Sequence, residues 1–181
     1  MSADRDSTGA ALPREERPSP DMLRVYGDTA FLAFRSPRHG RMPVATLRAY
    51  LEPPLLLGQF RIFRVDDVPR GMYTWAWMGQ EAERRLISGT PLRPEDWQSG
   101  DRLWIVDIIA PYRGMTASMV RWLMKPQNFT DRSFLFRRVA ENDRTRRIVH
   151  IDFQRDRLSR VMSEAEFLAE QEFLPSGRGA A

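Results

Sequence analysis

The sequence predicts a single α/β domain of the α+β type, in which helices flank a mostly antiparallel mixed sheet. Three observations predict this class. Apolar residues recur every three or four positions after Asp21, two pairs of alternating runs are each joined by a turn, and the short run 102–110 is almost wholly apolar. A length of 181 residues fits one domain, and a hydrophobic content of 42% is enough for a core.

The first half of the chain predicts two helices and a hairpin. A helix begins at Asp21 after Ser19-Pro20 and ends before Pro37, because proline disfavours helical geometry in the residue that precedes it. His39 and Gly40 then lie in a loop. A second helix follows Pro43 and ends near Pro53-Pro54. Residues 59–65 and 72–78 form a hairpin across the turn 66–71.

The second half predicts a central strand and a second hairpin. A short helix (80–87) and a loop (90–100) lead to RLWIVDIIA (102–110), which is short and β-branched and is expected as a buried central strand. A helix (115–125), a hairpin of 134–140 with 147–153 and a helix (163–173) complete the order. Ser163 and Glu166 match a capping box at the start of that helix.

The two ends of the chain differ from the middle. Residues 1–20 are polar and rich in proline and charge, which predicts a disordered leader, and 175–181 predict a loose tail around a domain of residues 21–174. The leader lacks the pattern of a secretory signal, and we find no stretch of about 18 apolar residues that would span a membrane. A cytoplasmic location is expected.

Composition excludes several kinds of chemistry. The chain has no cysteine, which excludes disulfides, thiol nucleophiles and cysteine-ligated zinc. Its two histidines, His39 and His150, lie far apart in sequence, so no metal site is expected. The net charge of +4 is too small to imply nucleic acid by itself. Nearly all the basic residues are arginines, whose planar guanidinium suits carboxylates and phosphates.

Two residues break local rules. Asp107 interrupts the apolar run, and a carboxylate in a buried strand is unfavourable unless it is paired. It could also face solvent or pair structurally with an arginine. His39 follows Ser36-Pro37-Arg38 in a loop between helices, where a lone histidine is usually a surface residue. On pattern alone these alternatives stay open.

Three segments resemble the family of RTX-toxin-activating lysine acyltransferases, the hemolysin-activating type. They are the Ser-Pro-Arg-His loop (36–39) with Met42-Pro43-Val44, the strand Tyr73-Thr74-Trp75-Ala76, and the run from Glu95 to Tyr112. The similarity is clear from Asp21 to Tyr112 and weaker to about Asp152. A match of that length is more specific than a four-residue motif.

The resemblance implies a fold related to the N-acetyltransferase (GNAT) fold and an activity on protein lysine. It implies a fatty acyl group donated by acyl-acyl carrier protein, no tightly bound cofactor, and an RTX-type protoxin as acceptor. The required histidine of the family falls on His39, its required aspartate on Asp107 and its motif serine on Ser36. A homodimer is a further expectation.

The expected mechanism is direct transfer. Histidine is the side chain whose ordinary pKa lies nearest neutrality, so His39 is expected to take the proton of the lysine. Asp107 would orient the imidazole or hold the ammonium, and Ser36 would donate to the thioester oxygen. A rival mechanism makes Ser36 the nucleophile, with His39 as its base and Asp107 as the orienting group.

Donor recognition is expected at two places. In GNAT relatives the segment after the central strand binds the donor's phosphate at the start of a helix. By that resemblance Arg113 and Gly114 would contact phosphopantetheine. The same residues are equally compatible with an ordinary turn between a strand and a helix. Acidic acyl carrier protein calls for an arginine-rich face, with Arg102, Arg113 and Arg121 as candidates by position. Trp75, Trp77 and Trp104 are expected in the core, with an acyl tunnel as the alternative.

Two other functions remain open at this stage. One is an N-acetyltransferase that uses acetyl-CoA or another acyl-CoA, against which the absence of a glycine-rich loop counts. The other is a non-catalytic toxin-binding chaperone with the same fold, which predicts that His39→Ala leaves the biological output intact.

Overall fold

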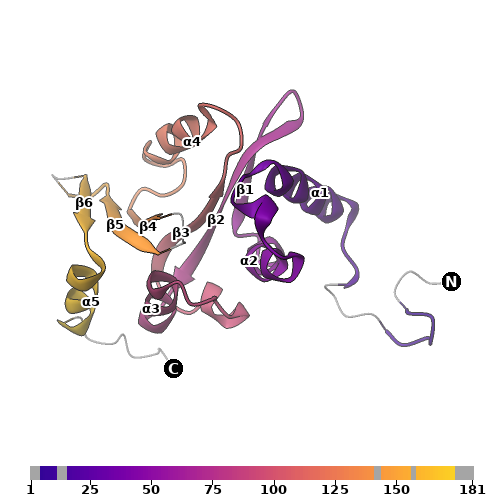
Figure 1. The fold of residues 1–181 in the computed structure, drawn as a ribbon, viewed down its shortest axis with the longest axis horizontal. Helices are drawn as coiled ribbons and strands as arrows, with labels where there is room; N and C mark the ends of the chain where they lie inside the picture. Colours follow the sequence, from indigo (N-terminus) through magenta and orange to yellow (C-terminus); the bar gives the residue numbers. More distant parts are fainter. Residues whose placement is uncertain (1–4, 12–15, 141–143, 156–157, 174–181) are drawn as a thin grey trace.

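The computed structural model describes residues 5–11, 16–140, 144–155 and 158–173. Parts of the predicted leader and the whole predicted tail, 175–181, lie outside the described residues. Between Pro20 and Phe173 the chain alternates helices and strands (Figure 1). The elements are α1 (Pro20–Arg35), η2 (His39–Arg41), α2 (Val44–Leu56), β1 (Phe60–Val65), β2 (Val68–Met78), α3 (Gln80–Ser88), η3 (Pro94–Trp97), β3 (Arg102–Ile109), α4 (Met115–Leu123), β4 (Ser133–Val139), β5 (Thr145–Asp152), β6 (Ser159–Met162) and α5 (Glu164–Phe173).

The strands form one six-stranded sheet in the order β1-β2-β3-β4-β5-β6. Neighbouring strands are antiparallel except β3 and β4, which are parallel. The predicted α/β class with a mostly antiparallel mixed sheet is confirmed, and the architecture is compatible with a GNAT-like fold. The run 102–110 forms the central strand β3, as the sequence predicts.

Strands β3 and β4 stop pairing before either strand ends. Only Trp104 with Leu135 and Ile105 with Phe136 are paired between β3 and β4. On its other side β3 carries a bulge, because Thr74 pairs with Asp107 whereas Trp75 pairs with Ile105. A bulge inserts one residue and bends the strand that carries it. Asp107 therefore lies just beyond the point where the sheet opens.

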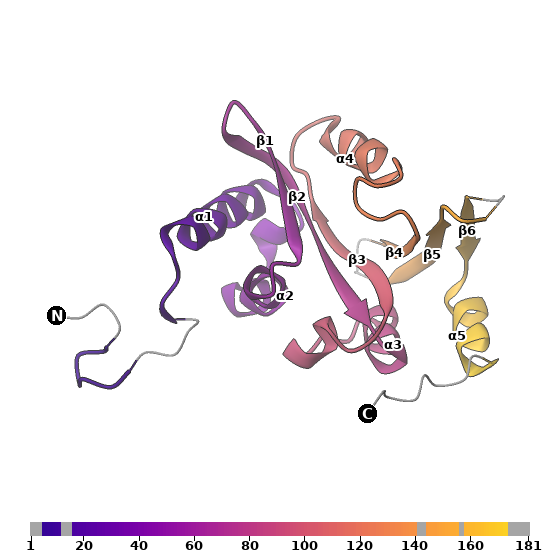
Figure 2. The same ribbon diagram turned by 180° about the vertical axis from the view of Figure 1, so that it is seen from behind.

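Helices cover both faces of the sheet. Alternate residues of β2 point to opposite sides, so Met72 contributes to a cluster with α1 and α2, Ala76 to one with α3 and α5, and Tyr73 to one with α4. Both ribbon views place α4 across the sheet from α1 and α2 (Figures 1 and 2). The result is three layers, with the central strand buried on both faces.

One predicted boundary was wrong, and one helix end lies slightly beyond the prolines that were expected to end it. The turn between β1 and β2 is only Asp66-Asp67, which adopt φ angles of 50° and 65°, so Val65 pairs directly with Val68 and β2 starts at Val68. Helix α2 also continues through Pro53 and Pro54 to Leu56. The carbonyls of these prolines accept bonds from Leu57 and Gln59, and burial of Pro54 and Leu55 holds the last turn in place.

One strand was missed, and one loop is more regular than expected. Strand β6 is only four residues long and buries Met162 alone, so it has no alternating pattern of its own. Its pairing with β5 defines it. His39 and Gly40 lie in the single 3-10 turn η2. The predicted capping box at Ser163 and Glu166 is confirmed by reciprocal hydrogen bonds between the two residues.

The approach to β3 depends on glycine at position 100. A Cβ there would lie 2.4 Å from the nitrogen of Gly79 and 2.5 Å from the carbonyl oxygen of Met78, both of them backbone atoms. We expect Gly100→Ala to lower the free energy of unfolding by about 1–3 kcal/mol or more, because backbone cannot yield as a side chain does.

The matched control for that prediction is Gly27→Ala in α1, where a Cβ meets nothing within 4 Å. It should raise the free energy of unfolding by up to about 1 kcal/mol through helix propensity. Urea denaturation of the two variants measures both changes. Equal effects from the two substitutions would contradict the close approach at Gly100.

Candidate active site

The end of α1 brings Ser36 and His39 inward. Pro37 follows the last helical turn, and the amide of Ser36 closes that turn on the carbonyls of Leu32 and Ala33. The amide of Gly40 then donates to the carbonyl of Ser36 at 2.9 Å, which folds the loop back on itself. A Cβ on Gly40 would lie 3.2 Å from the carbonyl oxygen of Phe34, so the return is tight. His39 is left 2% exposed.

Three predicted side chains form one hydrogen-bonded chain. Ser36 Oγ lies 2.8 Å from His39 Nδ1, and His39 Nε2 lies 2.7 Å from Asp107 Oδ2. The serine and histidine come from the loop after α1, whereas the aspartate comes from β3, 68 positions beyond the histidine. The structure therefore brings together the loop imidazole and the strand carboxylate. Their catalytic roles stay predictions.

The charge of Asp107 fixes the direction of its hydrogen bond with His39 Nε2. Burial by itself raises the pKa of this carboxyl. The hydrogen bond and charge of His39, the charge of Arg38 and the amide of Ile108 outweigh burial, so the pKa lies below its ordinary value. An ionised Asp107 accepts from Nε2–H. When the imidazole is neutral, Nδ1 is then an acceptor, and the hydroxyl of Ser36 donates to it.

Arg38 is a site residue that sequence reasoning missed. Its Nη1 donates to Asp107 Oδ1 at 3.0 Å, and the amide of Ile108 donates to the same oxygen at 2.9 Å. About a third of the Arg38 side chain is exposed, whereas Asp107 is buried. The sequence did offer one signal for Arg38, because it lies between Ser36 and His39 in the Ser-Pro-Arg-His motif. Because Arg38 and the amide of Ile108 bind Oδ1 of Asp107, Oδ2 is available to the imidazole of His39.

A hollow of about 150 Å³ opens where β3 and β4 part. It is lined by residues 105–108 of β3, by Phe136, Arg137 and Val139 of β4, and by Arg38. We call this hollow the wedge. Asp107 and Arg38 line it, and Ser36 and His39 lie behind Asp107 toward α1. The wedge thus gives solvent and ligands access to the carboxylate end of the hydrogen-bonded chain.

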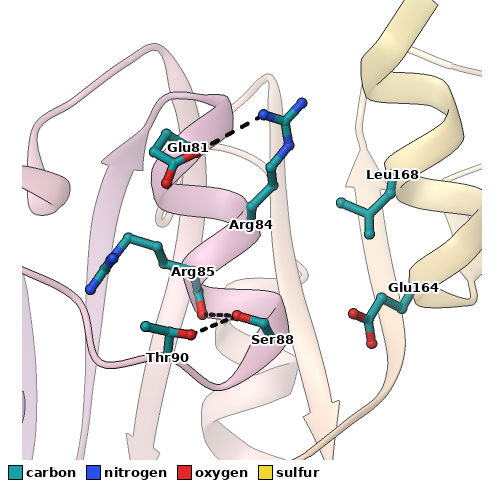
Figure 3. A pocket seen from close by; sticks show the side chains of 7 residues that line it. All are labelled: Glu81, Arg84, Arg85, Ser88, Thr90, Glu164 and Leu168. Carbon is teal, nitrogen blue, oxygen red and sulfur yellow. Dashed lines mark hydrogen bonds and ion pairs between the residues drawn. The ribbon is translucent and has the colours of Figure 1, made fainter.

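A second hollow, of about 470 Å³, lies between α3 and α5 (Figure 3). Several of its polar groups bond to one another: Ser88 Oγ donates to the carbonyl of Arg85 and lies 2.9 Å from Thr90 Oγ1, and Arg84 pairs with Glu81 at 4.0 Å. The residues that line this hollow come from other elements than the hydrogen-bonded chain. We therefore place the site in the wedge.

The other predicted contacts lie elsewhere on the fold. Arg113 and Gly114 are exposed in the link between β3 and α4, where Gly114 has a φ of 79°. The amides of Thr116 and Ala117 begin α4 and have no carbonyl of their own helix to reach. Arg102 is held by an ion pair with the buried Glu83, and Arg121 bonds to Ser118. Contact of phosphopantetheine with Arg113 and Gly114 remains a prediction.

The tryptophans divide between core and surface. Trp104 is fully buried and donates to Glu83, Trp75 packs against the α4 cluster, and Trp77 is 41% exposed. Within the part of the chain that the structure describes, no group of three His, Cys, Asp or Glu residues could hold a metal. None of its helices is long and apolar enough to cross a bilayer.

Comparison with known proteins identifies relatives across the site. The model of the RTX toxin acyltransferase family, HlyC, matches residues 19–152, which include all the candidate residues. The chain is 36% identical over 106 residues to the protein-lysine palmitoyltransferase CyaC of Bordetella bronchiseptica, covering 56% of this chain and 57% of that protein. It is 32% identical over 124 residues to a protein-lysine myristoyltransferase HlyC of Escherichia coli, covering 68% of this chain and 70% of that protein.

The depressed pKa of Asp107 predicts how stability depends on pH. As the pH falls, the unfolded chain binds the proton first, near the ordinary value of about 3.9. The contribution of the ionised carboxylate is therefore complete above that value and is lost as the pH falls through the folded pKa. At pH 7 we expect Asp107→Asn to lower the free energy of unfolding by about 1–3 kcal/mol.

Urea denaturation of wild type and Asp107→Asn between pH 7 and pH 3 checks this expectation, with the exposed Asp131→Asn as control. The gap between wild type and Asp107→Asn should close toward the acid end. A gap that stays constant or widens below pH 4 would show that the carboxylate is not held ionised.

Proposed function

The chain belongs to the RTX toxin acyltransferase family, and from this premise we propose that it is a protein-lysine acyltransferase that activates an RTX-type protoxin. It transfers a fatty acyl group from acyl-acyl carrier protein to internal lysine side chains. The observation that carries the proposal is the chain of hydrogen bonds from Ser36 through His39 to Asp107, which ends at an open wedge. The family match supports the reaction class.

The reaction requires a base. Near pH 7 only a few in ten thousand lysine side chains are neutral, a deficit worth roughly 4–5 kcal/mol. Only the neutral amine attacks a thioester. A positioned general base typically contributes about 10²–10⁴-fold, which offsets much of this deficit. The buried imidazole of His39, held on both sides, is a base of this kind.

Both ring nitrogens of His39 are engaged, and this shapes its role. The lysine proton passes to Ser36 Oγ while the hydroxyl proton of Ser36 passes to His39 Nδ1. Asp107 stabilises the imidazolium across the 2.7 Å bond to Nε2. The amine nitrogen bonds to the acyl carbon, the carbon–sulfur bond breaks, and the proton held by His39 passes to the thiolate. The second proton that the nitrogen loses is released to solvent, so one ammonium and one thioester give one amide, one thiol and one free proton.

The donor and its surroundings complete the proposal. The amides that begin α4, next to Arg113 and Gly114, would meet the phosphate of the phosphopantetheine arm. The reaction needs no tightly bound cofactor, because the thioester is already activated. A cytoplasmic location and a homodimer belong to the same proposal.

We expect His39→Ala to reduce lysine acylation by about 10²–10⁴-fold, the contribution of a general base. The experiment co-expresses the chain with an RTX-type protoxin and measures acyl mass shifts on its lysines. His150→Ala is the matched control, because His150 is the other histidine of the chain and lies half-buried on β5. Full acylation by a folded His39→Ala would favour a non-catalytic chaperone.

The same assay separates direct transfer from a covalent acyl-serine. We expect Ser36→Ala to slow transfer without abolishing it, and we expect no acyl group on Ser36 of the wild type after mixing with acyl-acyl carrier protein. Intact-mass spectrometry after acid quench measures this, with Ser118→Ala as control. An acyl adduct on Ser36 would establish the nucleophilic mechanism. Turnover with acetyl-CoA, but none with acyl-acyl carrier protein, would establish the alternative donor.

A further inference from the structure

A broad basic hollow lies on the β4–β5 hairpin beside the wedge. Its volume is about 520 Å³, and it is lined by Arg138, Val139, Arg146 and Arg147. Val139 also lines the wedge, so the two hollows share a wall. We call this cavity, with the guanidinium groups of Arg138, Arg146 and Arg147 that line it, the arginine hollow. It therefore lies beside the candidate site.

The arginine hollow is unfavourable for the fold by itself. Arg138 and Arg147 stand directly opposite each other in the register of β4 and β5, and like charges in that position destabilise a sheet. All three arginines are exposed. Among the described residues none of the three forms an ion pair, and Arg147 acts on Glu166 only at longer range. Among the described residues, therefore, no ion pair offsets this repulsion.

Three arginines elsewhere on the sheet and its helices pair with acidic side chains. Arg102 pairs with Glu83, Arg85 with Asp96, and Arg160 with Glu170. The arginine hollow differs from these sites in having several like charges that face a cavity. A ligand that carries several negative charges would remove the repulsion.

We propose that the arginine hollow docks the acidic surface of the acyl carrier protein, an assignment that rests on the proposed function. Three exposed guanidinium groups from two strands suit the spread carboxylates of a protein helix better than a single phosphate. A carrier docked there stands next to the wedge and so next to the candidate site. The net charge of +4 is too mild for nucleic acid.

The test uses the full chain and a charge-reversal variant, Arg146→Glu with Arg147→Glu. We expect about a tenfold or greater loss of affinity for apo acyl carrier protein, which lacks the phosphopantetheine arm, and a weaker dependence on salt. The matched control is Arg84→Glu, an exposed arginine of the hollow between α3 and α5 (Figure 3). Fluorescence anisotropy measures affinity, and thermal unfolding should show no loss of stability.

A second substrate separates docking from chemistry. Acyl-pantetheine carries the same thioester without the carrier, so the charge-reversal variant should use it at the wild-type rate while losing transfer from acyl-acyl carrier protein. Unchanged affinity for the apo carrier would overturn the docking surface. A loss of affinity confined to the holo carrier would show that the arginines bind the phosphate of the arm, and would overturn the proposal. Tight binding of heparin that the carrier cannot displace would indicate a nucleic-acid site, and would overturn it as well. If the wild type binds the carrier but transfers nothing, the proposed function fails while docking stands.

Discussion

The site depends on one buried hydrogen bond, 2.7 Å long, between His39 Nε2 and Asp107 Oδ2. It joins the loop after α1 to the central strand. Two features of the backbone make it possible. Pro37 ends α1, after which the chain turns back through Gly40, and the bulge in β3 sets Asp107 opposite Thr74 on the face that α1 covers. A carboxylate buried without these partners would be unfavourable, so the fold and the site stabilise each other.

A second buried carboxylate shows that burial by itself does not identify a catalytic group. Glu83 is as fully buried as Asp107 and is compensated by Arg102, Trp104 and Gln171. Burial outweighs those partners and raises the pKa of Glu83, whereas the partners of Asp107 prevail and lower its pKa. Glu83 ties α3 to β3 and α5 in a closed core. Asp107 instead borders an open wedge and contacts an imidazole, and this combination points to chemistry.

The elements predicted correctly from the sequence are those that a local pattern of residues specifies. Apolar spacing located α1 and α3, and the β-branched run located β3 with Asp107 inside it. The convergence of His39 with Asp107 came only from the resemblance, because no local rule relates residues 68 positions apart. Strand β6 was missed since pairing with β5 defines it, and Arg38 and Arg137 were missed since an arginine's role depends on what faces it. Arg38 left a trace in the Ser-Pro-Arg-His motif, and Arg137 left one as a basic residue at a buried position of β4.

The parting of β3 and β4 gives Asp107 a different environment on each of its two sides. On the wedge side, the carboxylate and Arg38 meet whatever enters between the strands. On the α1 side, His39 is shielded from water and reaches outward only through Ser36. An imidazole shielded in this way keeps a fixed geometry, and burial strengthens its pairing with Asp107. With closely paired β3 and β4, the same residues would lack the hollow that Asp107 and Arg38 line. The bulge and the early end of strand pairing therefore shape the candidate site as much as the side chains they position.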